Sequence, residues 1–547
     1  MHYRKRNAMK NNFLKLLSLF LAIVTLSLMV SCDLSSIMDD IAPDDLGNGV
    51  QNGASGDVQF TLEATETEAI KQTNKYEATF ITSIPALDID FEGEEICILY
   101  SSSNLREWYR DMPADEIDEA VAMRNNKVEE TLNVDISFEG IPYDNGNYTS
   151  YTSNFYSLVA TDINAAMHQY DISANLAYPS ASLAIRDYTA NLLDEEIFPY
   201  FNFSLPCWNQ SIVNNTAING RLYYVVGDAN LSLFDNAIVI WYNKNAYDRQ
   251  KEPTDPEDIQ QLALDGLWTY DELYRLLARS YQDIDGTGGY SEQDFYGLHV
   301  SNTPNNMNSS SATAFKYAWN IEFITENYDG THGFDIVDNV RTKEALEKCT
   351  SLLTSKGTCS SPQAAEYFAS GLSIFYMDEL YADENSNNKL REMEYKYGLL
   401  PLPKYDLDQV QYYTTASNSF SLMFVLDHTL SEGIIKGEAI SATLELLTEE
   451  SYSSVRGYYF NRVVKPKYFS TDDTEGTVTK SIALFDIIVA NIKFDLCNIY
   501  GAQLNNIDNI WSQSAMTNKD TLISDFEKQK MIFEQALEEL DAWFGLK

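Results

Sequence analysis

The sequence predicts an α/β protein, because apolar strand segments alternate with helical segments along the chain. The first strand signal is the run Ile-Cys-Ile-Leu-Tyr at 96–100, which is apolar on both faces, as expected of a central parallel strand. A helix is expected to follow over about 115–132. A second central strand is expected at 237–242, where the sequence reads Ala-Ile-Val-Ile-Trp-Tyr.

Further helices follow from start signals and from the spacing of apolar residues. Thr269 and Glu272 have the spacing of a capping box, in which the Thr side chain caps the first turn and the Glu side chain reaches back. Apolar residues keep helical spacing over 345–353 and over 533–543. No transmembrane segment is expected beyond the N-terminus, and no repeat of solenoid period is found.

The N-terminus has the pattern of an export signal. Basic residues between positions 4 and 10 precede an apolar run over 13–30, which ends at Ser31-Cys32. A cysteine directly after a small residue looks like a bacterial lipoprotein signal, in which residues 1–31 are removed and Cys32 carries the lipid. Met29 departs mildly from this pattern, which prefers Leu there. A plain signal or an uncleaved anchor helix is the alternative.

The segment after the signal and the overall charge indicate where the protein lies and which partners it avoids. Residues 32–75 are polar, acidic and rich in Gly, Asn and Ser, so we expect a flexible tether between the lipid and the folded body. The formal net charge is −43, which repels nucleic acid phosphates and disfavours direct docking on anionic lipid. We attribute the acidity to solubility. The expected location is extracytoplasmic, on a lipid anchor at the cell membrane.

Aromatic, cysteine and histidine content restricts the chemistry. Aromatic residues make up 13% of the chain, and their faces can pack in a core or stack on sugar rings. Five cysteines remain after Cys32, so at least one is expected to be unpaired. Cys97 and Cys349 lie in apolar patterns and are interpreted as core residues. Few histidines remain after the signal, which weakens any proposal of histidine-based catalysis.

No nucleophile elbow, zincin helix, P-loop or complete dinucleotide fingerprint is present, and no catalytic residue is assigned. With 81 acidic residues, some carboxylates fall close together by chance, so the sequence does not single out a glycosidase pair. A series of short segments does occur in a consistent order. They are 238–244 (IVIWYNK), 265–273 (DGLWTYDEL), 283–288 (DIDGTG), 294–298 (DFYGL), 397–404 (YGLLPLPK) and 411–414 (QYYT).

Together with the lipoprotein-type start, this series resembles the extracellular solute-binding proteins of ABC importers, family 1, and especially the large sugar-type binding lipoproteins of clostridia. The resemblance runs from about residue 90 to the C-terminus. It implies a two-lobe, periplasmic-binding-protein-like fold with hinge strands and a central ligand cleft. It places lobe 1 at 76–235 and 416–450, lobe 2 at 236–415, and a C-terminal helical region, 451–547, across both lobes.

The resemblance also suggests aromatic residues for the cleft. Trp208 matches a place where relatives often carry two tryptophans before the crossover between the lobes, and we select it first as a stacking residue. The segment 371–381 resembles one where maltose-type binding proteins place a stacking aromatic, and Tyr381 aligns with it. Trp319 is a third candidate. A core role is the alternative for each ring.

Three other residues complete the expected ligand site. Asp378 and Asp228 are candidate acceptors for sugar hydroxyls. Trp108 follows the first strand, and ligands of α/β lobes bind at the carboxyl ends of strands. Trp241, Trp511 and Trp543 are interpreted as packing residues.

A candidate calcium loop begins at Asp283. Its oxygen-bearing positions follow the twelve-residue EF-hand pattern, with a glycine at the sharp turn. Position 12 is Asp rather than Glu, which should weaken binding. The role would be structural, no cofactor is required, and a turn without metal is the alternative. The expected ligands are Asp283, Asp285, Thr287, Gly289, Ser291 and Asp294.

The sequence therefore predicts a monomeric, non-enzymatic solute-binding protein. It would capture a carbohydrate and deliver it to the membrane subunits of an ABC permease. We expect this carbohydrate to be an oligosaccharide. A surface polysaccharide-processing glycosidase and a glycan-adhesion lipoprotein are the alternatives from other classes. Within the binding class, a peptide or another polar solute also remains open.

Overall fold

The computed structural model describes residues 89–546, apart from 111, 144–146, 302–310, 381–389, 391–392, 465–475 and 518. The expected signal, tether and Cys32 lie outside the described residues. Among the helices that are described, none is both long and apolar enough to cross a bilayer.

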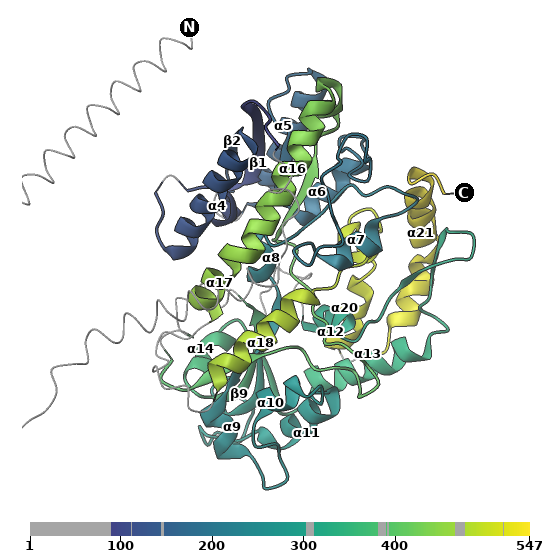
Figure 1. Cartoon of the computed structure of the whole chain (residues 1–547). Coiled ribbons are helices and arrows are strands. Elements are labelled where there is room, and N and C mark those ends of the chain that lie inside the picture. The colour runs from purple at the N-terminus through teal and green to yellow at the C-terminus, as the bar shows by residue number, and fades with distance from the viewer. Residues whose placement is uncertain are drawn as a thin grey trace, which may run out of the picture. The chain divides into compact units, whose positions relative to one another are not determined.

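The first of two main sheets contains the first predicted strand at its centre. Its order is β11-β3-β1-β2, with β1, β2 and β3 parallel and β11 antiparallel. Ile96, Ile98 and Leu99 are fully buried because helices cover this sheet, including α16 (Figure 1). The elements around this sheet, here called lobe 1, are β1 (Glu94–Ser101), α3 (Leu105–Trp108), α4 (Glu116–Leu132), β2 (Val134–Ile141), α5 (Tyr148–Asn164), β3 (Ile172–Leu176), α6 (Ala177–Ala184), α7 (Gln210–Thr216), α8 (Leu231–Asp235), β11 (Ser421–Val425) and α16 (Ile434–Glu450).

The second sheet contains the second predicted strand. Its order is β10-β4-β9-β5-β8, and β4 is antiparallel to both of its neighbours. We call the elements around this sheet lobe 2. They are β4 (Ile238–Asn243), α9 (Lys244–Gln250), α10 (Ile259–Leu264), α11 (Tyr270–Ser280), β5 (Tyr296–Ser301), α12 (Ser311–Ala318), the hairpin of β6 (Ile324–Glu326) and β7 (His332–Phe334), α13 (Val340–Leu353), β8 (Thr358–Ser361), α14 (Ala364–Ala369), β9 (Ser373–Glu379) and β10 (Tyr397–Leu400).

Two antiparallel segments carry the chain between the sheets. Residues 236–238 run beside 415–417, where Ile238 N–H donates to the Thr415 carbonyl at 2.9 Å and Ser417 N–H donates to the Asn236 carbonyl at 3.0 Å. The Ser417 hydroxyl also donates to the Asn236 side chain at 2.6 Å. The two lobes are thus joined by a short hydrogen-bonded ribbon, which we call the crossover ribbon.

The C-terminal helices contact both lobes. They are α17 (Arg456–Tyr459), α18 (Thr477–Ala490), α19 (Leu496–Ile499), α20 (Asn509–Thr517) and α21 (Leu522–Trp543), and two π-helical stretches, Ser451–Val455 and Phe460–Val464, flank α17. Helix α18 packs on β10, α20 packs on α12 and α13, and α19 packs on α6 of lobe 1. In Figure 1, α20 lies beside α12 and α13, and α21 packs against α20 and β7.

Most of the predicted elements are confirmed. The expected helix near 115–132 is α4, and the apolar patterns at 345–353 and 533–543 fall in α13 and α21. The predicted capping box is wrong. Thr269 does precede α11, but its side chain makes no capping hydrogen bond, and the Glu272 carboxylate instead accepts from Arg275 at 2.6 Å.

The cysteines and most tryptophans are inside the fold. Cys97, Cys207, Cys349, Cys359 and Cys497 are all unpaired. Burial raises the pKa of the Cys359 thiol to about 11, so this thiol stays protonated. Trp241 and Trp511 are fully buried, which confirms their interpretation as packing residues.

We expect Gly357→Ala to destabilise lobe 2 by about 3 kcal/mol, at the upper end of overpacking costs. A Cβ at Gly357 would lie 1.9 Å from the Leu277 carbonyl oxygen, and backbone atoms on both sides would have to move. The Gly357 carbonyl also accepts from the amides of Gly297 and Leu298 at 2.9 Å, so this movement would disturb β5. Urea unfolding measures the change.

Gly289→Ala is the matched control. A Cβ there meets no atom within 4 Å, so its free energy of unfolding should stay within about 0.5 kcal/mol of the parent. Equal stability of the two variants would contradict the packing described at Gly357.

Candidate functional site

A cavity of about 260 Å³ opens at the edge of the first sheet where its parallel strands end. Its walls come from the turn after β1, the segment after β2, the last residue of β3, helix α8 and Ser419 before β11. In open α/β sheets, ligands bind outside the carboxyl ends of the strands. The lobe thus has an opening where its topology predicts a ligand.

Two tyrosines supply the aromatic surface of the cavity. Tyr143 follows β2, and its amide donates to the Ser102 hydroxyl at 2.9 Å, while its ring meets Tyr151 edge-on at 5.2 Å. Tyr148 opens α5, and its ring lies 6.1 Å from that of Tyr178. Both side chains are only partly buried, so part of each ring can contact a ligand.

Two arginines from the turn after β1 line the same cavity. Arg106 pairs with Asp115 at 2.8 Å, and Arg110 pairs with Asp118 at 3.1 Å. Both aspartates lie at the start of α4, where a negative charge also interacts favourably with the helix dipole. The guanidinium groups are therefore held in place by α4.

Glu107 holds the wall of the cavity together. Its carboxylate accepts from the indole of Trp108 at 2.9 Å, from the Ser232 amide at 2.8 Å and from the Ser421 hydroxyl. Burial raises the pKa of Glu107 to about 7, against the lowering effect of the serine hydrogen bonds. The pKa of Glu107 is higher in the folded protein than in the unfolded chain. The protonated carboxyl of Glu107 therefore favours the folded state at low pH, and this stabilisation is lost as the pH rises through about 7.

Carboxyl groups also gather where the cavity meets the crossover ribbon. Asp235 lines the cavity and accepts from the Tyr459 hydroxyl at 2.6 Å. Glu379, at the end of β9, pairs in register with Ile238 of β4. Burial and the nearby charges of Asp378 and Asp235 raise the pKa of Glu379 to about 7, so this acid is partly protonated near neutral pH.

The three tryptophans selected from the sequence are enclosed by protein rather than lining this cavity. Trp208 is 2% exposed, and its indole donates to Glu445 at 2.9 Å. Trp319 is fully buried in lobe 2 and donates to the Pro403 carbonyl at 3.0 Å. Trp108 is fully buried beside Glu107. In this conformation none of the three offers a free ring face, and their stacking on a ligand stays a prediction.

The other selected residues lie apart from one another. Asp228 is buried and pairs with Arg456 at 3.1 Å, and burial raises its pKa to about 6 despite this partner. Asp378 is half-buried at the end of β9, where the Tyr376 hydroxyl donates to it. Tyr381 lies outside the described residues. None of the selected residues that the structure describes lines the cavity, and Trp108 comes nearest to it, through the hydrogen bond from its indole to Glu107.

Sequence reasoning missed the residues that line the cavity. Tyr143, Tyr148 and Asp235 stand in no motif, and their spacing along the chain is irregular. One signal was available for Tyr143, because it follows the carboxyl end of a strand in which apolar and polar residues alternate, and Trp108 also follows a strand. The position after each strand was thus informative, but the residue type was not.

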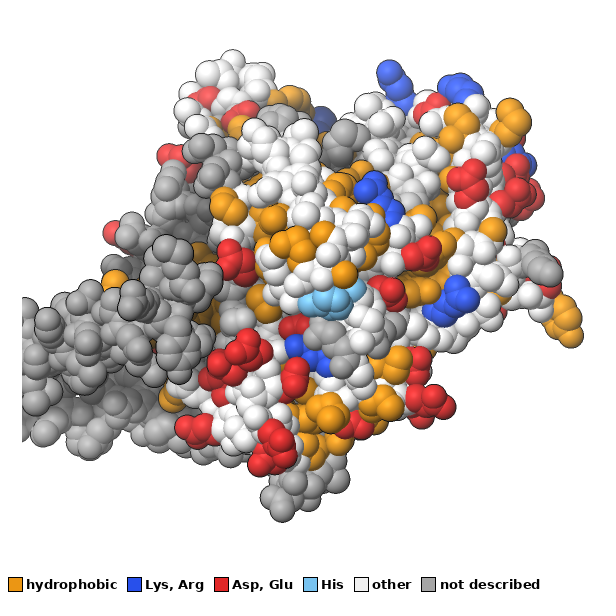
Figure 2. All heavy atoms as spheres, turned by 90° about the horizontal axis from the view of Figure 1, so that it is seen from above, with side chains coloured by type: hydrophobic (Ala, Val, Ile, Leu, Met, Phe, Trp, Pro, Cys, Tyr) orange, Lys and Arg blue, Asp and Glu red, His pale blue; other side chains and the backbone are white. Residues whose placement is uncertain are grey.

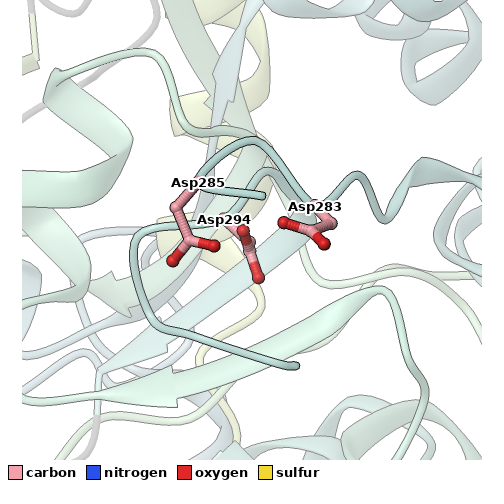
Figure 3. Close-up of side chains that lie close together, drawn as sticks. All are labelled: Asp283, Asp285 and Asp294. Atoms are coloured by element: carbon pink, nitrogen blue, oxygen red, sulfur yellow. The ribbon is translucent and has the colours of Figure 1, made fainter. Parts of the chain in front are cut away.

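The candidate calcium loop brings three carboxylates together. One oxygen each of Asp283, Asp285 and Asp294 lie within 4.8 Å of one another, and the three side chains converge in Figure 3. Asp283 accepts from the Gly286 amide at 2.7 Å, and Asp285 accepts from the Ser291 hydroxyl at 2.8 Å. These hydrogen bonds shape the loop without an ion, so the calcium site stays a prediction.

Comparison with known proteins informs the fold. No protein-family model and no curated protein matches the sequence. The sugar-binding protein MalE from the phytopathogen Xanthomonas citri is similar in structure, with a TM-score of 0.53 and 13% identity over 83% of this chain and 100% of that chain. A cyclic alpha-maltosyl-1,6-maltose binding protein from Arthrobacter globiformis is also similar in structure, with a TM-score of 0.51 and 14% identity over 83% of this chain and 99% of that chain.

An uncharacterized protein of Listeria monocytogenes is similar to the same extent, with a TM-score of 0.51 and 12% identity over 81% of this chain and 100% of that chain. The chain has the two-lobe α/β fold of periplasmic binding proteins. This confirms the fold class expected from the sequence. At such low identity the comparison concerns the fold alone.

We expect calcium to raise the Tm of the protein relative to EDTA, because an ion would replace the internal donors of the three carboxylates. Free calcium at a hundredfold excess over its Kd should stabilise the fold by about 2.7 kcal/mol. Asp285→Asn should reduce this response. Differential scanning calorimetry measures it.

Asp329→Asn is a matched control, since Asp329 also accepts from a turn amide, that of Thr331, at 3.1 Å, but lies outside the carboxylate group. Its response to calcium should equal that of the parent. Identical melting midpoints in calcium and EDTA, with no metal found by mass spectrometry, would remove the site.

Proposed function

We propose that this protein is a lipid-anchored, extracytoplasmic solute-binding protein that captures an oligosaccharide and delivers it to an ABC permease. The observation that carries the proposal is the cavity at the carboxyl edge of lobe 1, beside the crossover ribbon. A two-lobe fold can close over a ligand held at this place by a change confined to the linking segments.

The cavity chemistry suits a carbohydrate. Tyr143 and Tyr148 supply ring faces for the C–H patches of a sugar. The guanidinium groups of Arg106 and Arg110 donate hydrogen bonds, the Asp235 carboxylate accepts them, and sugar hydroxyls do both. Hydrogen bonds to such charged groups are stronger than those between neutral groups.

The carboxyl groups of Glu107 and Asp235 both line the cavity. Such a pair resembles the two carboxyl groups of a glycosidase, which is the first alternative function. Glu107 argues against this role, because its carboxylate already accepts from Trp108, Ser232 and Ser421. Asp235 is engaged by Tyr459. A binding protein should leave a bound oligosaccharide intact on prolonged incubation, whereas a glycosidase should shorten it. An adhesin should bind without closing.

The surface is compatible with a small, uncharged ligand rather than a polyanion. On the face shown in Figure 2, acidic, basic and hydrophobic side chains are interspersed, and this face carries no continuous basic surface among the described residues. The acidic excess of the whole chain disfavours nucleic acid as a partner.

Tyr148→Ala should weaken oligosaccharide binding by about 2 kcal/mol, or roughly thirtyfold in Kd, as truncation of a central aromatic contact does. The reason is the loss of a ring face at the cavity. Isothermal titration calorimetry with a glycan panel gives the affinity, and thermal melts test the fold.

Tyr328→Ala serves as the control, because Tyr328 is fully exposed and lies outside the cavity. It should bind like the parent. Unchanged affinity in Tyr148→Ala would show that the ligand lies elsewhere. Binding of a peptide but of no glycan would contradict the carbohydrate assignment, while the assignment to the importer class would stand.

Cys32→Ala should release the protein from membranes, because a single thioether would carry the anchor. Each buried methylene of a lipid chain adds about 0.8 kcal/mol to membrane attachment. Labelling with a palmitate analogue, followed by membrane fractionation, measures the change. Cys359→Ala, which removes a buried thiol of the folded body, should stay labelled and membrane-bound. Label on Cys32→Ala would refute the lipoprotein proposal.

A further inference from the structure

A second hollow lies between the two lobes and is walled by four parts of the chain. Tyr178 comes from α6 of lobe 1, Thr313 from α12 of lobe 2 and Asn418 from the end of the crossover ribbon. The fourth part is the C-terminal segment 497–509, from which Asn498 and Asn506 line the hollow.

This hollow adjoins the cavity of lobe 1. Asn418 lines the hollow and its neighbour Ser419 lines the cavity. Likewise, Tyr178 of the hollow and Tyr148 of the cavity hold their rings 6.1 Å apart. The two openings therefore lie on either side of one stretch of wall.

The lining of the hollow is polar and rich in side-chain amides. An amide carries both donors and acceptors, as a sugar hydroxyl does, and no lysine or arginine lines the hollow among the described residues. The Oδ1 atom of Asn498 is buried and accepts no hydrogen bond within the described part of the chain. A buried acceptor without a donor is costly, and a ligand hydroxyl would satisfy it.

The backbone fixes one of these amides in an unusual conformation. Asn505 and Asn506 are both left-handed, with φ of 54° and 51°. Asn adopts this region more readily than other non-glycine residues, and Asn133, Asn219 and Asn320 do the same elsewhere in the chain. Here this conformation places Asn506 in the wall of the hollow, where its Oδ1 lies 3.5 Å from the Tyr178 hydroxyl.

One carboxylate, that of Asp508, also lines the hollow, and its contacts hold the segment in place. Asp508 pairs with Lys316 of α12 at 3.0 Å and accepts from the Tyr317 hydroxyl at 2.7 Å. Lys316 is fully buried and also pairs with Asp495 at 3.2 Å. The segment is thus anchored to lobe 2, while Asn498 contacts Asn418 of the crossover ribbon at 3.5 Å.

We propose that the ligand site continues past Tyr148 and Tyr178 onto the C-terminal segment, where Asn498 and Asn506 bind an uncharged, hydroxyl-bearing sugar unit at one end of an oligosaccharide. The hollow measures about 20 Å³, which is room for one water-sized group, so it takes a hydroxyl of a ring that lies across its mouth. This inference rests on the proposed function. Its consequence is that affinity depends on the chain length of the oligosaccharide.

The experiment compares affinity with chain length in the full chain purified in detergent. Calorimetry is run with α-glucan, β-glucan, mannan and xylan oligosaccharides, from disaccharide to heptasaccharide. In the parent, affinity should rise with length until both openings are filled. Asn506→Gly and Asn498→Leu should weaken binding of the longer members by about tenfold and leave the disaccharide unchanged.

Asn505→Gly is the matched control. It relieves the same left-handed backbone one residue earlier, at an exposed position that does not line the hollow, and should bind every length like the parent. If the series binds but Asn506→Gly and Asn498→Leu lose nothing, or lose equally at every length, the extended site is refuted and the proposed function stands. If no oligosaccharide binds the parent, the proposed function itself fails.

Discussion

The site depends on the crossover ribbon, in which 236–238 run antiparallel to 415–417. The hydrogen bonds of this ribbon fix Asn236 and Ser417 side by side, so α8 on one side and Ser419 on the other are both placed at the cavity. The Glu107 carboxylate adds a second tie, because it accepts from α8 through Ser232 and from β11 through Ser421. The turn after β1 and both crossing segments are therefore held as one unit.

This arrangement explains why buried acids are tolerated beside the site. Glu107 and Glu379 would each be costly as bare charges in a buried place, and burial raises the pKa of both to about 7. Serine hydrogen bonds compensate part of this cost for Glu107. Asp235 has its own donor, Tyr459, which lies between two π-helical stretches of the helix that leaves lobe 1. The walls of the cavity are thus assembled from groups that restrain one another.

The sequence predicts the parts of this protein that depend on local pattern. The strands β1 and β4 stand out because buried strands are continuous apolar runs, and α4, α13 and α21 because apolar spacing is a local property. The carboxylates of 283–294 are gathered by one short loop, so their spacing is also visible in the sequence.

The residues that line the cavity could not be predicted in the same way. Trp208 and Tyr148 are both aromatic residues at or just before a helix start, but the first is enclosed by Phe201, Phe203 and Glu445 while the second lines an opening. Which ring is enclosed depends on segments that meet from distant parts of the chain. The sequence carries the residue types, and only the packing decides which of them reach a ligand.

The most direct test of the account is a crystal structure of the protein with the tightest-binding oligosaccharide of the panel. The account predicts electron density for the sugar at the carboxyl edge of lobe 1, with a ring against Tyr143 or Tyr148 and hydroxyls within hydrogen-bond distance of Arg110 or Asp235. Density for the sugar at another place, for example against Trp208 in a rearranged lobe 1, would contradict it.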